Sequence, residues 1–251
     1  MLVHSPSLLR FPLGLAWCAA ALLARDVDSS DVGGHAPDSP TLIPGDPFPA
    51  LEPAMMEAFQ RGDAAFELPH REGSGLGPLY IRTSCNACHV GDLKGPGLVQ
   101  KMSVVEADGL TPSADQSLLP FGHTVRPLTA AGASEGIFAP DDPAVKVTIR
   151  IGPPVLGRGY LEAIADEEIE RMAAEQSGRD DGIHGRIARV GYHSQKSADP
   201  AFHDHTLGDE GIIGRFGLKA RVATLDDFTA DAFQGDMGLT SPLRPEELPN
   251  P

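Results

Sequence analysis

Hydrophobic residues recur at helical spacing in three parts of the chain. Leu51, Met55 and Phe59 lie four residues apart, and they predict a helix that begins near residue 51. Similar patterns predict a helix over residues 166–176, with a glycine just past its end, and a last helix over residues 225–235. The face of the second helix that we expect to be buried consists of Ala165, Ile169, Met172 and Ala173.

Residues 145–151 have a different pattern, in which hydrophobic and polar residues alternate. This period of two predicts a half-buried strand, which Gly152 and the two following prolines would end. Residues 103–144 lack periodicity and are rich in Gly, Pro, Asp and Ser, so we expect mostly loop there. Gly and Pro together supply about a fifth of the 251 residues, above the average of roughly 12%. The pattern therefore predicts one folded, loop-rich domain with some β-strand content over residues 51–245, followed by an irregular tail over residues 246–251.

The N-terminus has the pattern of an export signal. Arg10 precedes an apolar run over residues 11–24 that ends among small residues, which predicts a signal peptide over residues 1–25. Residues 26–50 are rich in Pro and Gly and are expected to form a linker. The sequence thus predicts a periplasmic or secreted protein with no integral membrane span after cleavage. An uncleaved N-terminus would instead anchor the protein to the membrane.

The charge of the chain restricts its partners. There are 35 acidic and 20 basic residues, and the formal net charge is −15. Nucleic acid binding needs a basic face that can replace phosphate counterions, so nucleic acid is a poor partner. An acidic surface suits a protein partner with a basic or neutral surface.

The candidate chemistry lies in Cys85-Asn86-Ala87-Cys88-His89. The order C-x-x-C-H is the pattern for covalent haem attachment. Two thiols three positions apart lie on one side of a helical turn, where each can add to one vinyl group of the same porphyrin. The adjacent imidazole can then bind the iron as the proximal ligand. Its other ring nitrogen is expected to donate to a carbonyl or carboxylate.

Three other interpretations of the two cysteines explain less. A thioredoxin-like redox pair needs a strand–helix context and gives no role to His89. A tetrahedral zinc site needs four ligands, and the chain has no second cysteine pair. A structural disulfide would also leave His89 unexplained. The remaining cysteine, Cys18, lies in the predicted signal peptide, where a lipid modification is disfavoured by the bulky Trp17 before it.

Five stretches together resemble one family of proteins. They are residues 75–89, 152–164, 181–186, 214–220 and 232–241, which read GLGPLYIRTSCNACH, GPPVLGRGYLEAI, DGIHGR, GRFGLKA and AFQGDMGLTS. In this order they resemble the bacterial di-haem c-type cytochrome oxidoreductases, which are classed as peroxidases or labelled thiol oxidoreductases. The resemblance implies a mainly helical, cytochrome-c-like fold, a periplasmic location, haem c as the iron cofactor and a redox function.

The chain departs from that family at two points. Leu218 stands where a tryptophan is expected, and no second C-x-x-C-H follows before Pro251. We therefore expect the chain to resemble the N-terminal haem portion alone. This predicts a c-type cytochrome module with one covalent haem that transfers electrons to or from a redox partner protein.

The sixth coordination position of the iron distinguishes between functions. A methionine there is typical of an electron carrier, whereas an open position allows peroxide to bind. We predict Met237 as this ligand, in a turn formed by residues 235–238. The alternatives are Met102, Met172, His123, the later histidines or no protein ligand. A haem peroxidase, an incomplete di-haem enzyme, is the alternative function, for which Glu135 is a candidate acid–base residue. A third possibility is a fragment without haem that acts in binding or structure.

Overall fold

The fold is described here from a computed structural model, which covers residues 47, 51–92, 95, 97–196 and 203–251. Helices make up 26% and strands 16% of these residues. The prediction of a mainly α, cytochrome-c-like fold is therefore wrong, because most of the described chain is loop and short antiparallel sheet. The predicted signal peptide and the predicted linker, except Pro47, lie outside the described residues.

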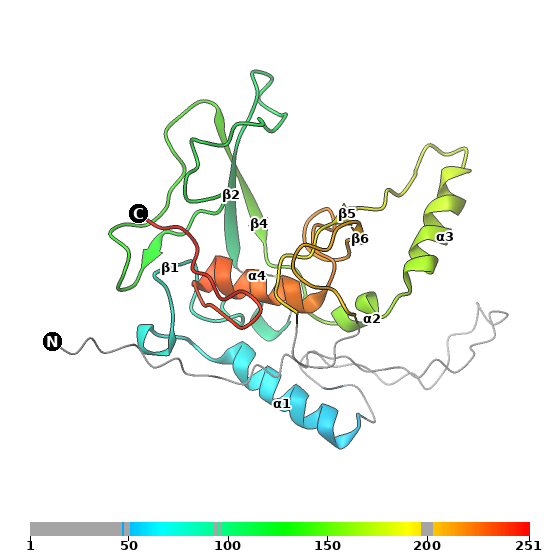
Figure 1. Ribbon diagram of the computed structural model, residues 1–251, viewed down its shortest axis with the longest axis horizontal. Coiled ribbons are helices and arrows are strands. Elements are labelled where there is room, and N and C mark those ends of the chain that lie inside the picture. The colour runs from blue at the N-terminus through cyan, green and yellow to red at the C-terminus, as the bar shows by residue number, and fades with distance from the viewer. Residues whose placement is uncertain (1–46, 48–50, 93–94, 96, 197–202) are drawn as a thin grey trace.

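The longest regular pairing is an antiparallel pair of two seven-residue strands, which we call the hairpin although a long stretch of chain separates the strands in the sequence. β2 (Leu98–Val104) pairs with β4 (Val145–Ile151), with Leu98 opposite Ile151 and Val104 opposite Val145. The strand predicted over residues 145–151 is thus confirmed. Figure 1 shows this hairpin rising beside α4 (Leu225–Met237). The other pairs are β1 (Leu79–Tyr80) with β3 (Leu128–Thr129), and β5 (Arg189–Val190) with β6 (Ile212–Ile213).

The three predicted helices are present near the predicted positions. They are α1 (Pro53–Glu67), α3 (Asp166–Ser177) and α4, and the structure adds the short α2 (Arg158–Glu162) and the 3₁₀ turns η1 (Glu72–Ser74) and η2 (Val90–Asp92). Pro53 occupies the first turn of α1, where its missing N–H costs no hydrogen bond. Thr224 caps α4 by accepting a hydrogen bond from the backbone N–H of Asp227.

The buried face predicted for α3 is wrong. No residue of α3 is buried, and Met172 is 46% exposed. In Figure 1, α3 stands at the edge of the molecule, apart from the hairpin and α4. Ion pairs hold it to the rest of the chain instead, from Arg215 to Asp166 and from Arg189 to Glu170, both at 2.5 Å.

The main hydrophobic core lies at one end of the β2–β4 hairpin. It consists of Leu79, Met102, Val104, Leu119, Val125, Ile137 and Val145. The other end of the same hairpin face is uncovered by described residues, since Val147, Ile149 and Ile151 are 43%, 64% and 46% exposed. Only part of the predicted apolar strand face is therefore in the core.

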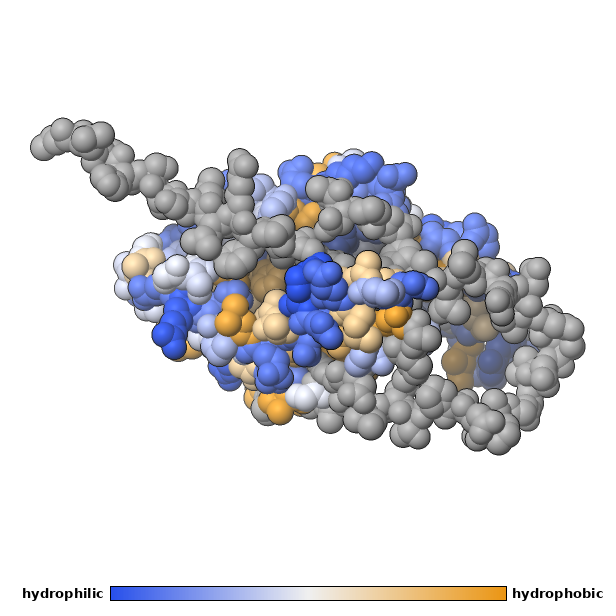
Figure 2. Space-filling view, turned by 90° about the horizontal axis from the view of Figure 1, so that it is seen from below, coloured by the Kyte–Doolittle hydropathy of each residue, from blue (hydrophilic) through white to orange (hydrophobic). Residues whose placement is uncertain are grey.

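The surface away from this core is largely polar. Figure 2 shows small hydrophobic groups among mostly hydrophilic residues on the face seen from below. Among the described residues, no helix combines the length and the hydrophobicity needed to cross a membrane.

Candidate functional site

The cysteine motif forms a single helical turn. The backbone N–H groups of Cys88 and His89 both donate to the carbonyl of Cys85, at 2.9 and 3.0 Å. The hydroxyl of Ser84 accepts from the N–H of Ala87 at 3.2 Å, as a capping residue does. The turn carries Cys85 and Cys88 as free thiols, three positions apart on one short segment. This is the local geometry that the C-x-x-C-H spacing predicts.

The imidazole of His89 is oriented by a residue far away in the sequence. Its Nδ1 lies 2.7 Å from the carbonyl oxygen of Pro153. A carbonyl oxygen can only accept, so Nδ1 carries the ring proton and Nε2 has the lone pair that could bind a metal. Pro153 thus has the orienting role expected of a carbonyl beside a metal-binding histidine.

Two glycines let the ends of the hairpin pack directly on the motif. Gly97, just before β2, lies so close that an added Cβ would overlap the Cα, Cβ and Sγ atoms of Cys88. A Cβ on Gly152, just after β4, would lie 2.9 Å from the Cys88 carbonyl oxygen and 3.0 Å from Cε1 of His89. The N–H of Gly97 donates to that carbonyl at 3.3 Å. Both positions therefore require glycine for close backbone approach.

The end of α1 holds the other side of the motif. The carbonyl of Phe66 accepts from the backbone N–H of Asn86 at 3.2 Å. The Phe66 ring lies beside the His89 imidazole, with 6.2 Å between ring centres. Phe66 is buried, so α1 contributes an apolar wall next to the candidate iron ligand.

The electrostatics of the thiols argue against a redox-active dithiol. Burial, and then the negative charge of Asp236, raise the pKa of Cys85 to about 12. The same two causes raise the pKa of Cys88, with a smaller opposing effect from Arg82. Catalytic cysteine pairs need a lowered pKa, because the thiolate is the nucleophile. These cysteines are instead thiols at neutral pH.

Asp236 connects α4 to the motif. Its carbonyl accepts hydrogen bonds from the N–H groups of Ile81, at 2.7 Å, and Arg82, at 3.4 Å. Burial raises the pKa of the Asp236 carboxyl to about 6; the positive charge of Lys101 opposes this increase, and the negative charge of Asp231 makes a smaller contribution to it. Sequence reasoning did not single out this residue, although its neighbour Met237 was a candidate ligand.

Met237 is not in a turn, contrary to the sequence prediction. It is the last residue of α4 and only 3% exposed, and the helix ends at Gly238, which has φ +66°. Gly235 costs helix stability, roughly 1 kcal/mol relative to alanine, but contacts of the helix end outweigh this cost. One of them is the hydrogen bond from the N–H of Gly77 to the Met237 carbonyl at 3.0 Å.

The other candidate ligands lie elsewhere. Met102 is buried in the hydrophobic core, four residues along β2 from Leu98 and thus roughly 14 Å from the strand end at the motif. Met172 is exposed on α3. Nδ1 of His123 lies 3.3 Å from the Met102 carbonyl. Of the later histidines, His203 and His205 stack on each other with ring centres 5.0 Å apart, and His184 approaches the Gln176 carbonyl.

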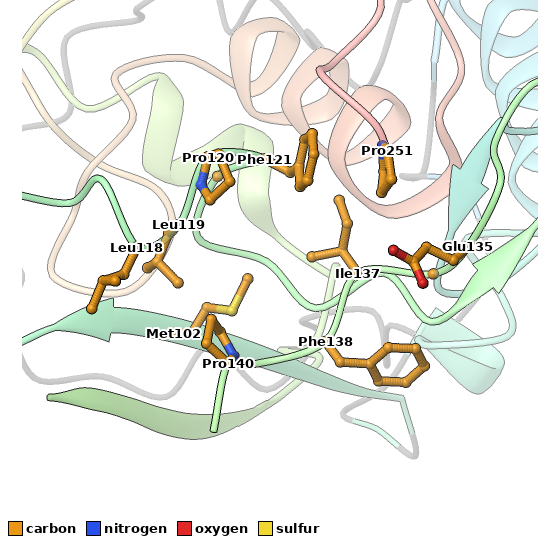
Figure 3. A pocket seen from close by; sticks show the side chains of 12 residues that line it. Met102, Leu118, Leu119, Pro120, Phe121, Glu135, Ile137, Phe138, Pro140 and Pro251 are labelled. Carbon is orange, nitrogen blue, oxygen red and sulfur yellow. The ribbon is translucent and has the colours of Figure 1, made fainter. Parts of the chain in front are cut away.

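Glu135, the candidate acid–base residue, lines a separate cavity of about 380 Å³. Figure 3 shows its carboxylate turned towards the space between Phe121, Ile137 and Pro251. The full lining is Met102, Leu118, Leu119, Pro120, Phe121, Gly122, Glu135, Gly136, Ile137, Phe138, Pro140 and Pro251. No residue of the cysteine motif belongs to it, so the structure does not bring Glu135 together with Cys85, Cys88 or His89.

Comparison with known proteins gives one match. Residues 136–249, slightly under half of the chain, match the model of the family described as "Di-haem oxidoreductase, putative peroxidase". No curated protein and no solved structure matches the chain. The matched range includes Pro153, Asp236 and Met237 but not the cysteine motif, so the expectation of a likeness to the N-terminal haem portion alone is not confirmed. Over residues 136–249, the chain is similar to the di-haem oxidoreductases, a family that implies a haem cofactor and redox chemistry.

Proposed function

We propose that the protein is a periplasmic c-type cytochrome module that binds one covalent haem and transfers electrons. The S–H groups of Cys85 and Cys88 add across the two vinyl groups of the haem, each sulfur bonding one carbon and each hydrogen the other. Nε2 of His89 binds the iron. The observation that carries this proposal is the hydrogen bond of 2.7 Å from Nδ1 of His89 to Pro153, because it orients a ligand imidazole directly beside two free thiols.

The surroundings of the motif suit a porphyrin. Val90, Leu98 and Ile151 are 53%, 48% and 46% exposed, and they follow the motif or lie at the end of the hairpin that packs on it. Large exposed hydrophobic side chains next to a candidate haem-binding motif are expected where a bound ligand would cover them. When bound, the haem supplies one-electron redox chemistry at its iron. The chain supplies attachment, an oriented imidazole and an apolar wall.

Electron transfer fits the site better than peroxide turnover does. A peroxidase needs an acid–base group near the iron to move the protons of peroxide. Glu135 lines a cavity that shares no residue with the motif. The family description nevertheless favours a peroxidase as the second candidate function. For the carrier, the net charge of −15 favours a redox partner protein with a basic or neutral docking surface.

The sixth ligand gives the test of this function. We expect Met237 to bind the iron, so the oxidised holoprotein should show the weak near-infrared band of a His–Met haem and turn over peroxide poorly. Met237→Ala should remove the band and increase peroxide turnover, because a thioether no longer competes with peroxide. Near-infrared absorption and a peroxide assay measure both effects.

Met102→Ala is the matched control, since Met102 is equally buried, at 4% against 3% exposure. Both variants lose packing, about 2–5 kcal/mol for a buried methionine, but only the Met237 variant should lose the band. A wild-type protein that is high-spin and turns over peroxide would reject the carrier and favour the peroxidase. A Met237 variant with an unchanged spectrum would reject Met237 as the ligand.

Export is a separate part of the proposal. Covalent haem of this type is attached outside the bacterial cytoplasm, and the apolar run over residues 11–24 follows a basic residue. We expect the mature N-terminus, read by mass spectrometry on a periplasmic fraction, to lie between about residues 20 and 30. An intact Met1 in a soluble cytoplasmic pool would contradict export, whereas an intact Met1 in the membrane fraction would indicate an uncleaved anchor.

A further inference from the structure

One edge of the β2–β4 hairpin is open. β2 pairs with β4 along all seven residues, and Figure 1 shows no described strand on the other side of β4. The second edge of β2 is covered, because the N–H of Met102 donates to the His123 carbonyl at 2.9 Å. The N–H of Val125 likewise donates to the Gln100 carbonyl at 3.1 Å. Within the described part of the chain, the open edge of this sheet is therefore the outer edge of β4.

These bonds show which residues of β4 point outward. In an antiparallel pair, residues alternately direct their backbone N–H and C=O groups towards the partner strand and away from it. Gln100 and Met102 direct theirs away from β4. Ile149 and Val147 lie opposite them and therefore direct theirs away from β2, and Ile151 follows in the same alternation. Among the described residues, no partner accepts from or donates to these outward groups.

The residues with outward backbone groups also carry exposed hydrophobic side chains. Val147, Ile149 and Ile151 lie on one face of β4, and Ile149 is the most exposed of the three. An open strand edge with unpaired backbone groups is a template for a further strand. A segment added there would gain backbone hydrogen bonds, and its alternate side chains would pack beside those of β4. The outer edge of β4 thus has the geometry for strand addition.

The charge of the hairpin indicates which segment would fit. The charged residues of β2 and β4 are Lys101, Lys146 and Arg150, all of them basic, in a chain of net charge −15. Nζ of Lys146 donates only to the Pro143 carbonyl, at 2.9 Å, and Nε of Arg150 is buried without a hydrogen-bond partner. Opposite charges on neighbouring strands stabilise their pairing. Acidic residues at every second position of an added strand would therefore complement β4.

We propose that the outer edge of β4 binds an extended segment of a partner protein in which hydrophobic and acidic residues alternate. Its hydrophobic side chains lie beside Val147 and Ile149, and its carboxylates pair with Lys146 and Arg150. This binding does not require a haem in the protein. A β4 strand from a second copy fits less well. The antiparallel register that pairs all three outward residues is centred on Ile149, and it places Arg150 diagonal to Lys146 and Arg150 of the copy, where like charges repel.

The test measures the binding of two short synthetic peptides to the full chain. One alternates valine with glutamate and the other alternates valine with lysine. We expect only the glutamate peptide to bind, with saturation below about 1 mM and weaker binding at high salt. NMR-detected hydrogen exchange should slow at the amides of Val147 and Ile149, which point outward. The amide of Thr148 already faces β2, so its exchange should change less.

Variants at Ile149 separate strand addition from general attraction to the surface. Ile149→Pro removes one outward N–H and no bond to β2, because proline is tolerated on an edge strand where its nitrogen faces solvent. It should weaken binding of the glutamate peptide by at least about tenfold. Ile149→Ala covers the case in which the proline variant fails to fold, and should weaken binding by a smaller factor. Ile183→Ala is the matched control, since Ile183 is 69% exposed against 64% for Ile149 but lies outside the hairpin.

Three results would overturn the proposal. One is that the glutamate peptide does not bind, or binds no better than the lysine peptide. Another is that it binds without slowing exchange at Val147 and Ile149, or binds Ile149→Ala as well as Ile183→Ala, which would place it elsewhere on the surface. The third is that the protein alone self-associates and slows exchange at the same two amides, which would make a second copy the occupant of this edge.

Discussion

Replacing both Cys85 and Cys88 with alanine should abolish covalent haem attachment. Each thioether needs one thiol to add across one vinyl group, and the motif holds the only cysteines outside the predicted signal peptide. The protein is expressed with a cytochrome c maturation system, and haem is detected by its peroxidase stain on a denaturing gel. Wild type should retain the stain and the double variant should lose it completely, because an iron–histidine bond does not survive denaturation.

The controls separate attachment from folding. Cys18→Ala removes the third cysteine and should leave the stain unchanged. Either single variant at the motif should retain a weaker stain, since one thioether can still form. Retention of covalent haem in the double variant would reject the attachment site. If a protein that has been cleaved before residue 50 keeps an unchanged haem stain, the predicted N-terminal segments take no part in haem binding.

The site was predictable where its geometry is local. The turn at the cysteine motif closes within five residues, so its spacing alone predicts how Cys85, Cys88 and His89 lie. For the hydrogen bond of His89, the sequence predicted the chemical type of the acceptor, a carbonyl or a carboxylate, but not the residue that supplies it. Pro153 is 64 residues further along the chain, and its stretch was recognised as the end of a strand and as part of a family resemblance. Only the pairing of β2 with β4 reveals that it reaches the motif.

The prediction of the fold class was wrong because local sequence patterns do not show what packs on the hydrophobic face of a helix or strand. The strand at residues 145–151 was predicted, but its partner β2 was not, since Leu98 and Val99 precede polar residues and the pairing crosses a long loop region. The residues of α3 have a helical pattern, yet none of them is buried. The resemblance to a helical family added helix content that the structure does not show.

A second prediction with a large expected effect concerns the network of ion pairs that fixes α4, the helix that carries Asp236 and Met237. The side chain of Asp227 is fully buried, and its Oδ1 accepts from Nη2 of Arg244 and from the Ser194 hydroxyl, both at 2.7 Å. Nη1 of Arg244 also pairs with Asp231 at 2.8 Å. The network joins the start and middle of α4 to the C-terminal segment and to the chain after β5.

Arg244→Met should lower the free energy of unfolding by about 3–5 kcal/mol, because it leaves the buried Asp227 carboxylate without its cation. Urea unfolding of the holoprotein, followed by circular dichroism, measures the change in midpoint at constant slope. The double variant Arg244→Met with Asp227→Asn removes both charges and retains an acceptor for Ser194. It should therefore recover part of the lost stability.

Arg179→Met is the control for the loss of an arginine from an ion pair. Arg179 pairs with Asp181 in an exposed loop, where water screens the interaction, so the unfolding midpoint should not change. If Arg244→Met lowers the free energy of unfolding as little as the control does, the buried ion pair does not stabilise α4. Equal losses in the single and double variants would instead assign the effect to the packing of the Arg244 side chain, because the uncompensated charge is absent from the double variant. Only a large loss with partial recovery shows that charge pairing at Asp227 stabilises the fold around α4, the helix beside the cysteine motif.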